Sequence, residues 1–191
     1  MTKKIVLTGG PASGKTTMLS ILKEEYGTDI EVAKEAATLV YSGGFPRNDT
    51  SKRYTYHAQR IIYTCTRELE DLATEINPSA KLILCDRGSL DGAVYWPYGE
   101  EDFLKVMGTD IKTECDRYYA IIHMSPPSDP KYYQNTAVRI ETLERALEVD
   151  REILKIWESH PRRVIIPAYD DFVEKALLVR KTIKQIIDGE I

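Results

Sequence analysis

Short apolar runs alternate with longer segments of mixed polarity along this chain. Runs such as Ile-Val-Leu and Leu-Ile-Leu are typical of strands buried on both faces, and the pattern predicts strands over 4–8, 30–33, 81–86, 118–124 and 164–167. Strands that alternate with helical segments indicate βαβ units. We therefore expect an α/β fold of three layers, in which helices cover both faces of a mostly parallel sheet.

Four segments between these runs carry apolar residues at three- and four-residue steps, which predicts helices over 15–26, 35–41, 51–76 and 137–158. The longest of them ends at Asn77-Pro78, because proline cannot continue a helix. Asp171 and Glu174 predict the start of a closing helix, since an acceptor side chain there satisfies free backbone N–H groups. The Gly- and Pro-rich segments 42–50 and 125–135 are expected to be loops.

The segment after the first predicted strand fits the phosphate-binding pattern GxxxxGK[ST], known as Walker A. Glycine lets the backbone turn so that successive N–H groups face one concavity, and the following helix presents its positive N-terminus to the same anion. Lys15 is expected to reach the β- and γ-phosphates, and the Thr16 hydroxyl to bind Mg²⁺. The expected nucleotide-binding residues are Gly9, Gly10, Pro11, Ala12, Ser13, Gly14, Lys15, Thr16 and Thr17. The pattern does not define the base, so ATP is expected and GTP stays open.

An acidic residue ends the third apolar run, where Asp86 follows Leu-Ile-Leu-Cys. This is the Walker B arrangement, in which the carboxylate binds Mg²⁺ directly or through water, so Thr16 and Asp86 are the predicted metal ligands. Arg87 follows at once. Its guanidinium suits a phosphate or carboxylate of a substrate, or alternatively a structural ion pair, and the sequence leaves both open.

Two further features bear on phosphoryl transfer. Glu35 follows the second predicted strand, where it would accept a proton from a substrate hydroxyl, unless it is simply a first-turn glutamate that the helix dipole favours. Arg139 and Arg145 begin the helix after the Pro-rich loop, and arginines there would neutralise charge on a transferred phosphoryl group within a lid over about 125–146. Their spacing sets them roughly 120° apart on a helix. Arg139 is therefore preferred, and Arg145 can instead be a solvated residue paired with Glu141.

The composition and net charge of the chain restrict the classes of partner that it is expected to bind. The 191 residues carry 26 Lys and Arg against 30 Asp and Glu, a net charge of −4 that argues against a general nucleic-acid binder but allows a local cationic cleft. Hydrophobic residues make up 42% and charged residues 29%, as in a folded globular protein. Three widely spaced cysteines suggest neither a disulfide framework nor a zinc site. The apolar runs are too short for a signal peptide or a membrane span, so we expect one cytoplasmic domain over 1–191, monomeric or homodimeric.

The stretches IVLTGGPASGKTT, AKEAA, LILCDRGSLDGAVY and YYQNTAVRIETLERALEVDREI together resemble the P-loop ATPase/kinase domains grouped as the AAA-28 family. That family is similar to the ribosylnicotinamide kinase domain of bacterial NAD-biosynthesis regulators and, more distantly, to thymidylate and deoxynucleoside kinases. The resemblance implies a nucleoside-kinase-like P-loop NTPase fold with five parallel strands in the order 2-3-1-4-5 and a helical lid. It also implies that Glu35 and Asp86 lie near the transferred phosphate and that Arg139 is a lid arginine. Lys34-Glu35-Ala36 replaces the Arg-Glu-Pro element of thymidylate kinases, which argues against a thymidylate substrate.

The leading hypothesis is therefore a Mg²⁺-dependent kinase that transfers a phosphoryl group from ATP or GTP to a small-molecule acceptor such as a nucleoside or nucleotide. The expected catalytic residues are Lys15, Glu35, Asp86 and Arg139. The acceptor would lie between Glu35, the helix over 51–76 and the lid. Its expected contacts are Arg60, Arg87 and Arg145. The alternative is an NTP-dependent regulatory switch or NTPase without such an acceptor, although the sequence lacks the Asn-Lys-x-Asp element of Ras-like GTPases.

Overall fold

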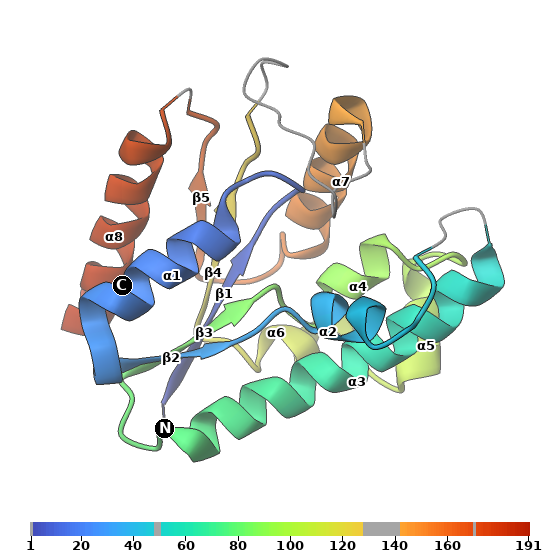
Figure 1. The fold of residues 1–191 in the computed structure, drawn as a ribbon, viewed down its shortest axis with the longest axis horizontal. Coiled ribbons are helices and arrows are strands. Elements are labelled where there is room, and N and C mark those ends of the chain that lie inside the picture. Colours follow the sequence, from blue (N-terminus) through green and yellow to red (C-terminus); the bar gives the residue numbers. More distant parts are fainter. Residues whose placement is uncertain (1, 48–50, 128–141, 170) are drawn as a thin grey trace.

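A parallel sheet forms the centre of the molecule. The computed structural model describes residues 2–47, 51–127, 142–169 and 171–191, and within them five strands pair in the order β2-β3-β1-β4-β5 (Figure 1). All four pairings are parallel. The strands are β1 (Lys3–Thr8), β2 (Ile30–Ala33), β3 (Leu82–Asp86), β4 (Ala120–Met124) and β5 (Arg163–Ile166). The predicted α/β class and the implied strand order are confirmed.

Helices connect these strands and cover both faces of the sheet. Within the described residues they are α1 (Lys15–Tyr26), α2 (Ala36–Ser42), α3 (Lys52–Ile76), α4 (Asp91–Val94), α5 (Glu100–Met107), α6 (Ile111–Cys115), α7 (Leu143–Ile156) and α8 (Phe172–Asp188). A short 3-10 helix, Gly27–Asp29, leads into β2. Each parallel strand is thus followed by at least one helix, as a βαβ architecture requires.

Alternation of side chains along β1 divides the core into two layers. Ile5 and Leu7 point to the face that α1 and α8 cover, where they pack with Met18 and Ile183. Val6 points to the opposite face and joins a second layer formed by residues of α3, α4, α5 and α7. Because both faces are buried, the central strands are apolar at successive positions, which is why their short runs could be recognised.

The long helix α3 confirms its predicted limits to within one residue. Ser51 precedes it in an extended conformation, and its side chain accepts a hydrogen bond from the backbone N of Tyr54. The helix ends at Ile76, directly before Asn77-Pro78. The predicted cap of the last helix is also present, because the Asp171 side chain accepts from the backbone N of Val173 at the start of α8.

The predicted helix over 137–158 is wrong at its start. Helix α7 begins at Leu143, because Thr142 is extended and its hydroxyl oxygen accepts from the backbone N of Arg145 at 3.2 Å. Residues 137–141 lie outside the described residues, as does most of the predicted lid. The short helices α4, α5 and α6, in the segment between β3 and β4, had not been predicted from the sequence. They contain four to eight residues each, too few to display a helical period.

No helix in the described ranges is both long enough and apolar enough to cross a membrane. The three cysteines, all of them within these ranges, are free thiols. Cys85 and Cys115 are buried in the core layer beneath α3 and α7. These two thiols fill space in the core.

Candidate functional site

The Walker A segment forms a tight loop between β1 and α1 at the carboxyl end of the sheet. Gly9 has φ 130°, and a Cβ on it would lie 2.1 Å from the carbonyl oxygen of Met124 at the end of β4. Gly14 has φ 89° and directly precedes α1. Between them, Ala12 adopts φ 66°, a left-handed conformation that is uncommon for a residue with a side chain. The loop therefore needs its glycines for both backbone turn and close approach to β4.

Lys15 folds back over this loop. Its Nζ donates to the carbonyl oxygens of Gly9 and Gly10, at 2.9 and 3.0 Å, and to Ser13 Oγ at 2.9 Å. Burial and, to a lesser extent, the nearby charge of Arg87 lower the pKa of Lys15 to about 7, against the opposing effect of Asp86. An incoming polyphosphate would favour the charged amine. The ammonium is thus poised where a phosphate would gain most from it.

Thr16 and Asp86 come together as the metal-site prediction requires. Thr16 Oγ1 donates to Asp86 Oδ2 at 3.2 Å, across the gap between α1 and the end of β3. Burial raises the pKa of the Asp86 carboxyl, while the charge of Lys15 lowers it. The two oxygens fit Mg²⁺, which takes one or two protein ligands and fills its remaining positions with phosphate oxygens and water. The described residues contain no cluster of three or more His, Cys, Asp or Glu side chains that could hold a metal ion by themselves.

Glu35 and Arg87 form an ion pair beside these groups. Glu35 Oε1 accepts from Arg87 Nε at 2.8 Å, and Glu35 Oε2 accepts from Thr38 Oγ1 at 2.5 Å. Burial alone would raise the pKa of Glu35, but the Arg87 charge and these hydrogen bonds outweigh it and lower the pKa to about 2. Arg87 therefore makes the structural ion pair that the sequence left open, and the pair keeps a charged carboxylate next to the phosphate loop.

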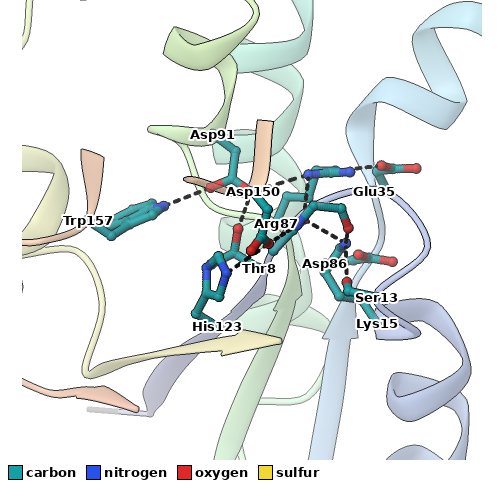
Figure 2. Close-up of polar contacts among 12 residues, drawn as sticks. Thr8, Ser13, Lys15, Glu35, Asp86, Arg87, Asp91, His123, Asp150 and Trp157 are labelled. Atoms are coloured by element: carbon teal, nitrogen blue, oxygen red, sulfur yellow. Dashed lines mark hydrogen bonds and ion pairs between the residues drawn. The ribbon is translucent and has the colours of Figure 1, made fainter. Parts of the chain in front are cut away.

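A buried aspartate that the sequence does not single out, Asp91, bonds to several residues beside the phosphate loop (Figure 2). Asp91 is 2% exposed and accepts hydrogen bonds from Thr8 Oγ1 at 2.6 Å and from Trp157 Nε1 at 2.7 Å. Its Oδ2 also lies 3.6 Å from a terminal nitrogen of Arg87. Arg87 lies four residues before Asp91 but outside α4, which begins at Asp91, so the helical spacing rule gave no signal for this contact.

Asp150 is a second buried acid near the loop. Its Oδ1 accepts from the backbone N of Gly10 at 2.7 Å and lies 2.9 Å from Nε2 of His123, a side chain that is 1% exposed (Figure 2). This carboxylate comes from α7, 140 residues after the loop. No pattern in the sequence could have paired the two.

Arg60 and Arg145, the other predicted arginines that the structure describes, do not join these contacts. Arg139 falls outside the described residues. Arg145 is exposed on α7 and pairs with Glu148 at 2.6 Å, whereas Glu141, the partner expected for a solvated Arg145, lies outside the described residues. Arg60 is exposed on α3, with its guanidinium 5.6 Å from the centre of the Tyr56 ring. It lines a surface hollow of about 430 Å³.

The structure therefore brings five of the predicted site residues into one cluster at the carboxyl ends of β1, β2 and β3. They are Lys15, Thr16, Glu35, Asp86 and Arg87. In open α/β sheets, ligands bind at this end of the strands. The cluster combines backbone N–H groups, a buried lysine, a hydroxyl with a carboxylate for a metal, and a separate carboxylate held by an arginine. This set of groups suits polyphosphate binding and phosphoryl chemistry.

A family model described as an AAA domain matches residues 4–175 of the chain. This range contains every residue of the cluster. A search of curated proteins finds no match.

Several solved structures share the fold. Deoxyadenosine kinase from M. mycoides with bound dATP has a TM-score of 0.62 and 13% identity, over 95% of this chain and 99% of that one. The same kinase with products dCMP and a flexible dCDP bound has a TM-score of 0.64 and 15% identity, over the same shares of the two chains. NadR protein in complex with NAD and AMP-PNP has a TM-score of 0.57 and 17% identity, over 87% of this chain and 44% of NadR. The chain thus spans less than half the length of NadR, and at these identities the likeness shows a nucleoside-kinase-like P-loop fold.

Proposed function

Because the chain belongs to the AAA-28 family of AAA domains, we propose that it binds ATP or GTP together with Mg²⁺ and transfers the γ-phosphoryl group to a small molecule. The acceptor is a hydroxyl or phosphate group of a nucleoside-like compound. The closest functional alternative is a switch or NTPase that hydrolyses the nucleotide without such an acceptor.

One observation carries the proposal: a second carboxylate, Glu35, lies beside the phosphate loop and is not part of the Thr16–Asp86 metal pair. Metal binding and nucleotide binding are both accounted for without it. A carboxylate next to the transferred phosphate can orient an acceptor hydroxyl and accept its proton. Because Arg87 and Thr38 hold the pKa of Glu35 at about 2, the carboxylate is charged at every physiological pH and can accept a hydrogen bond from an acceptor hydroxyl. A carboxylate that neither metal binding nor nucleotide binding needs favours a kinase over a switch.

Each residue of the cluster then has a role. The loop amides and Lys15 would hold the β- and γ-phosphates, and the lysine would neutralise charge that develops on the bridging oxygen. Thr16 and Asp86 would hold Mg²⁺, and the ion would supply positive charge to neutralise the phosphates. The acceptor oxygen attacks the γ-phosphorus while the bond from this phosphorus to the β–γ bridging oxygen breaks. The hydroxyl proton passes to Glu35.

Most of the rate enhancement is expected from positioning the acceptor and the nucleotide, because the protein forms no covalent bond to the transferred phosphoryl group. Arg87 acts on the reaction through Glu35, whose carboxylate it holds at 2.8 Å. The role of Arg139 as a lid arginine stays part of the proposal. The acceptor class rests on the solved neighbours, which are a deoxyadenosine kinase and NadR with NAD and AMP-PNP.

An ADP- or GDP-release assay against a panel of nucleosides, nucleotides and related vitamins tests the proposal. We expect one acceptor class to accelerate release, and Lys15→Met to remove that acceleration. Lys181→Met, at an exposed position of α8, is the matched control. A kinase is excluded if release is the same with every acceptor, which is the behaviour of the alternative switch. If Lys15→Met binds nucleotide and turns over like the wild type, the site itself is wrongly assigned.

A further inference from the structure

A lysine outside the Walker A motif contacts the outer side of the phosphate loop. Lys175 belongs to α8 and is 3% exposed. Its Nζ donates to the carbonyl oxygen of Ser13 at 3.2 Å and to that of Ser125 at 2.5 Å. Ser13 lies in the middle of the loop, and Ser125 directly follows β4. Lys175 therefore connects the loop to the end of the strand beside β1.

The contact of Lys175 with the Ser13 carbonyl also fixes the orientation of the peptide unit between Ser13 and Gly14. In a trans peptide unit, the C=O of one residue and the N–H of the next point in opposite directions. Lys175 holds the Ser13 carbonyl on the outer side, so the N–H of Gly14 is turned the opposite way, away from α8. Inward-facing amides at this position are what hold phosphate oxygens in a loop of this type.

Asp150 acts in the same way on the first peptide unit of the loop. It accepts the N–H of Gly10 at 2.7 Å, and the carbonyl oxygen of Gly9, on the opposite side of that peptide unit, accepts from Lys15 Nζ at 2.9 Å. The Asp150 carboxylate thus turns the Gly9 carbonyl toward Lys15. The Lys175 ammonium turns the Gly14 N–H away from α8. The two side chains come from α7 and α8, which flank the loop from opposite faces of the sheet.

Lys175 is a buried charged residue, and the cost of burying it indicates that its contacts with the loop are important for the loop's conformation. Burial lowers the pKa of Lys175 to about 8, and the charge of Asp150 partly opposes that change. A leucine or methionine would fill the same space without any desolvation cost. A buried ammonium is favourable here only because loop carbonyls and a nearby carboxylate compensate it.

We propose that Lys175 and Asp150 are positioning residues, which together form a brace that sets the two peptide orientations of the Walker A loop and thereby its affinity for nucleotide phosphates. The proposal rests on the proposed function for the identity of the ligand. Neither side chain needs to touch the nucleotide.

Binding of MgATP and MgGTP by calorimetry is the first measurement. We expect Lys175→Met to weaken binding by about 5- to 150-fold, the range for one buried polar group left without its partner. Lys175→Arg keeps the charge and the donors and should recover part of the loss. Lys181→Met, which removes an exposed lysine from the same helix, should bind like the wild type.

Hydrogen exchange of the nucleotide-free protein is the second measurement, because it does not depend on the proposed function. Lys175→Met should speed exchange in peptides that cover 9–17 and leave those of β1 and β3 unchanged. Asp150→Ala should do the same, and Asp150→Asn, which keeps an oxygen acceptor for Gly10, should do so less. If Lys175→Met fails to fold, Lys175→Gln carries the same comparison.

The outcomes separate the two proposals. If wild-type protein binds neither nucleotide, the proposed function fails, and the brace is judged on exchange alone. Unchanged loop exchange in the Lys175 variants overturns the brace. Faster exchange with unchanged nucleotide affinity overturns it as well. A lower melting temperature with normal exchange and normal affinity shows that Lys175 only stabilises the fold.

Discussion

Arg87 Nε lies 2.8 Å from Glu35 Oε1, and this ion pair joins the carboxyl ends of β3 and β2. Arg87 has φ 74°, a left-handed conformation that costs a non-glycine residue about 1–3 kcal/mol. Its backbone N donates to the carbonyl oxygen of Leu7 at 3.0 Å, which holds it there. Only 18% of the Arg87 side chain and 28% of the Glu35 side chain are exposed. The fold thus uses a strained residue to direct a guanidinium at one carboxylate.

Glu35→Gln should lower the rate of phosphoryl transfer by roughly 10²- to 10⁴-fold, because an amide cannot accept the proton of the acceptor hydroxyl. Affinity for the Mg-nucleotide should change little, since Glu35 is not part of the Thr16–Asp86 pair. Single-turnover transfer and calorimetry measure the two quantities. Glu31→Gln is the control, because Glu31 lies on β2, the strand that precedes Glu35, and bonds to Lys23. Wild-type turnover in Glu35→Gln would remove this residue from the mechanism.

The acid stability of the protein should also depend on Glu35. Its pKa is about 2 in the folded state, against 4.5 in the absence of its partners. A carboxyl with a lowered folded pKa stabilises the fold fully above the unfolded pKa, and this contribution is lost as the pH falls through 4.5 toward 2. Urea unfolding between pH 7 and 3 should therefore show a shallower acid decline for Glu35→Gln. The slope with pH is the readout, since Arg87 also loses its partner. Parallel slopes for the variant and the wild type contradict the prediction, and Glu24→Gln on the exposed side of α1 is the control.

Asp86→Asn should raise the Mg²⁺ concentration needed for half-maximal turnover by at least about tenfold, because a neutral amide is a poor ligand for a hard cation. Thr16→Ala should act in the same direction and Thr16→Ser should not, since serine keeps the hydroxyl. The measurement is a MgCl₂ titration at fixed nucleotide concentration. Nucleotide binding in EDTA should remain in all three variants. An unchanged Mg²⁺ requirement in Asp86→Asn would move the metal site away from β3.

Trp157→Phe should destabilise the fold by about 1–3 kcal/mol, because it leaves an oxygen of Asp91 buried without its donor. Trp157 Nε1 bonds that carboxylate at 2.7 Å, and Asp91 is buried. Trp96→Phe is the matched control, since it removes an equal bond, to Asp102, whose carboxylate is only half-buried. Equilibrium unfolding in urea gives both values. Equal losses in the two variants would show that ring packing, and not the bond to Asp91, determines the cost.

The strands and the phosphate loop could be predicted because their signals are local. Burial on both faces makes each central strand an apolar run, and the Walker A loop needs fixed residue types at neighbouring positions. Glu35 and Asp86 were found by the same reasoning, since Asp86 ends β3 and Glu35 lies two residues after β2, and the carboxyl ends of both strands face the site.

The supporting groups could not be found in this way. Asp150 contacts Gly10 across 140 residues, and Lys175 contacts Ser13 across 162, so their pairing exists only in the fold. For Arg145 the sequence left a lid contact and a solvated helix position open. In the structure it pairs with Glu148 and Glu152 on its own helix, and its role in substrate binding stays a prediction.

Gly9→Ala should abolish nucleotide binding and destabilise the fold. Gly9 has φ 130°, and a Cβ there would lie 2.1 Å from the Met124 carbonyl oxygen, a backbone atom that no rotamer change can remove. Gly99→Ala is the matched control, because Gly99 also has a positive φ, 86°, but no atom lies within 4 Å of its Cβ position. It should lose about 1 kcal/mol or somewhat more from backbone strain and keep its nucleotide affinity. The difference between the two variants, measured by urea unfolding and calorimetry, isolates the contact of the loop with β4. Normal binding by Gly9→Ala would mean that the loop does not need to lie against that strand.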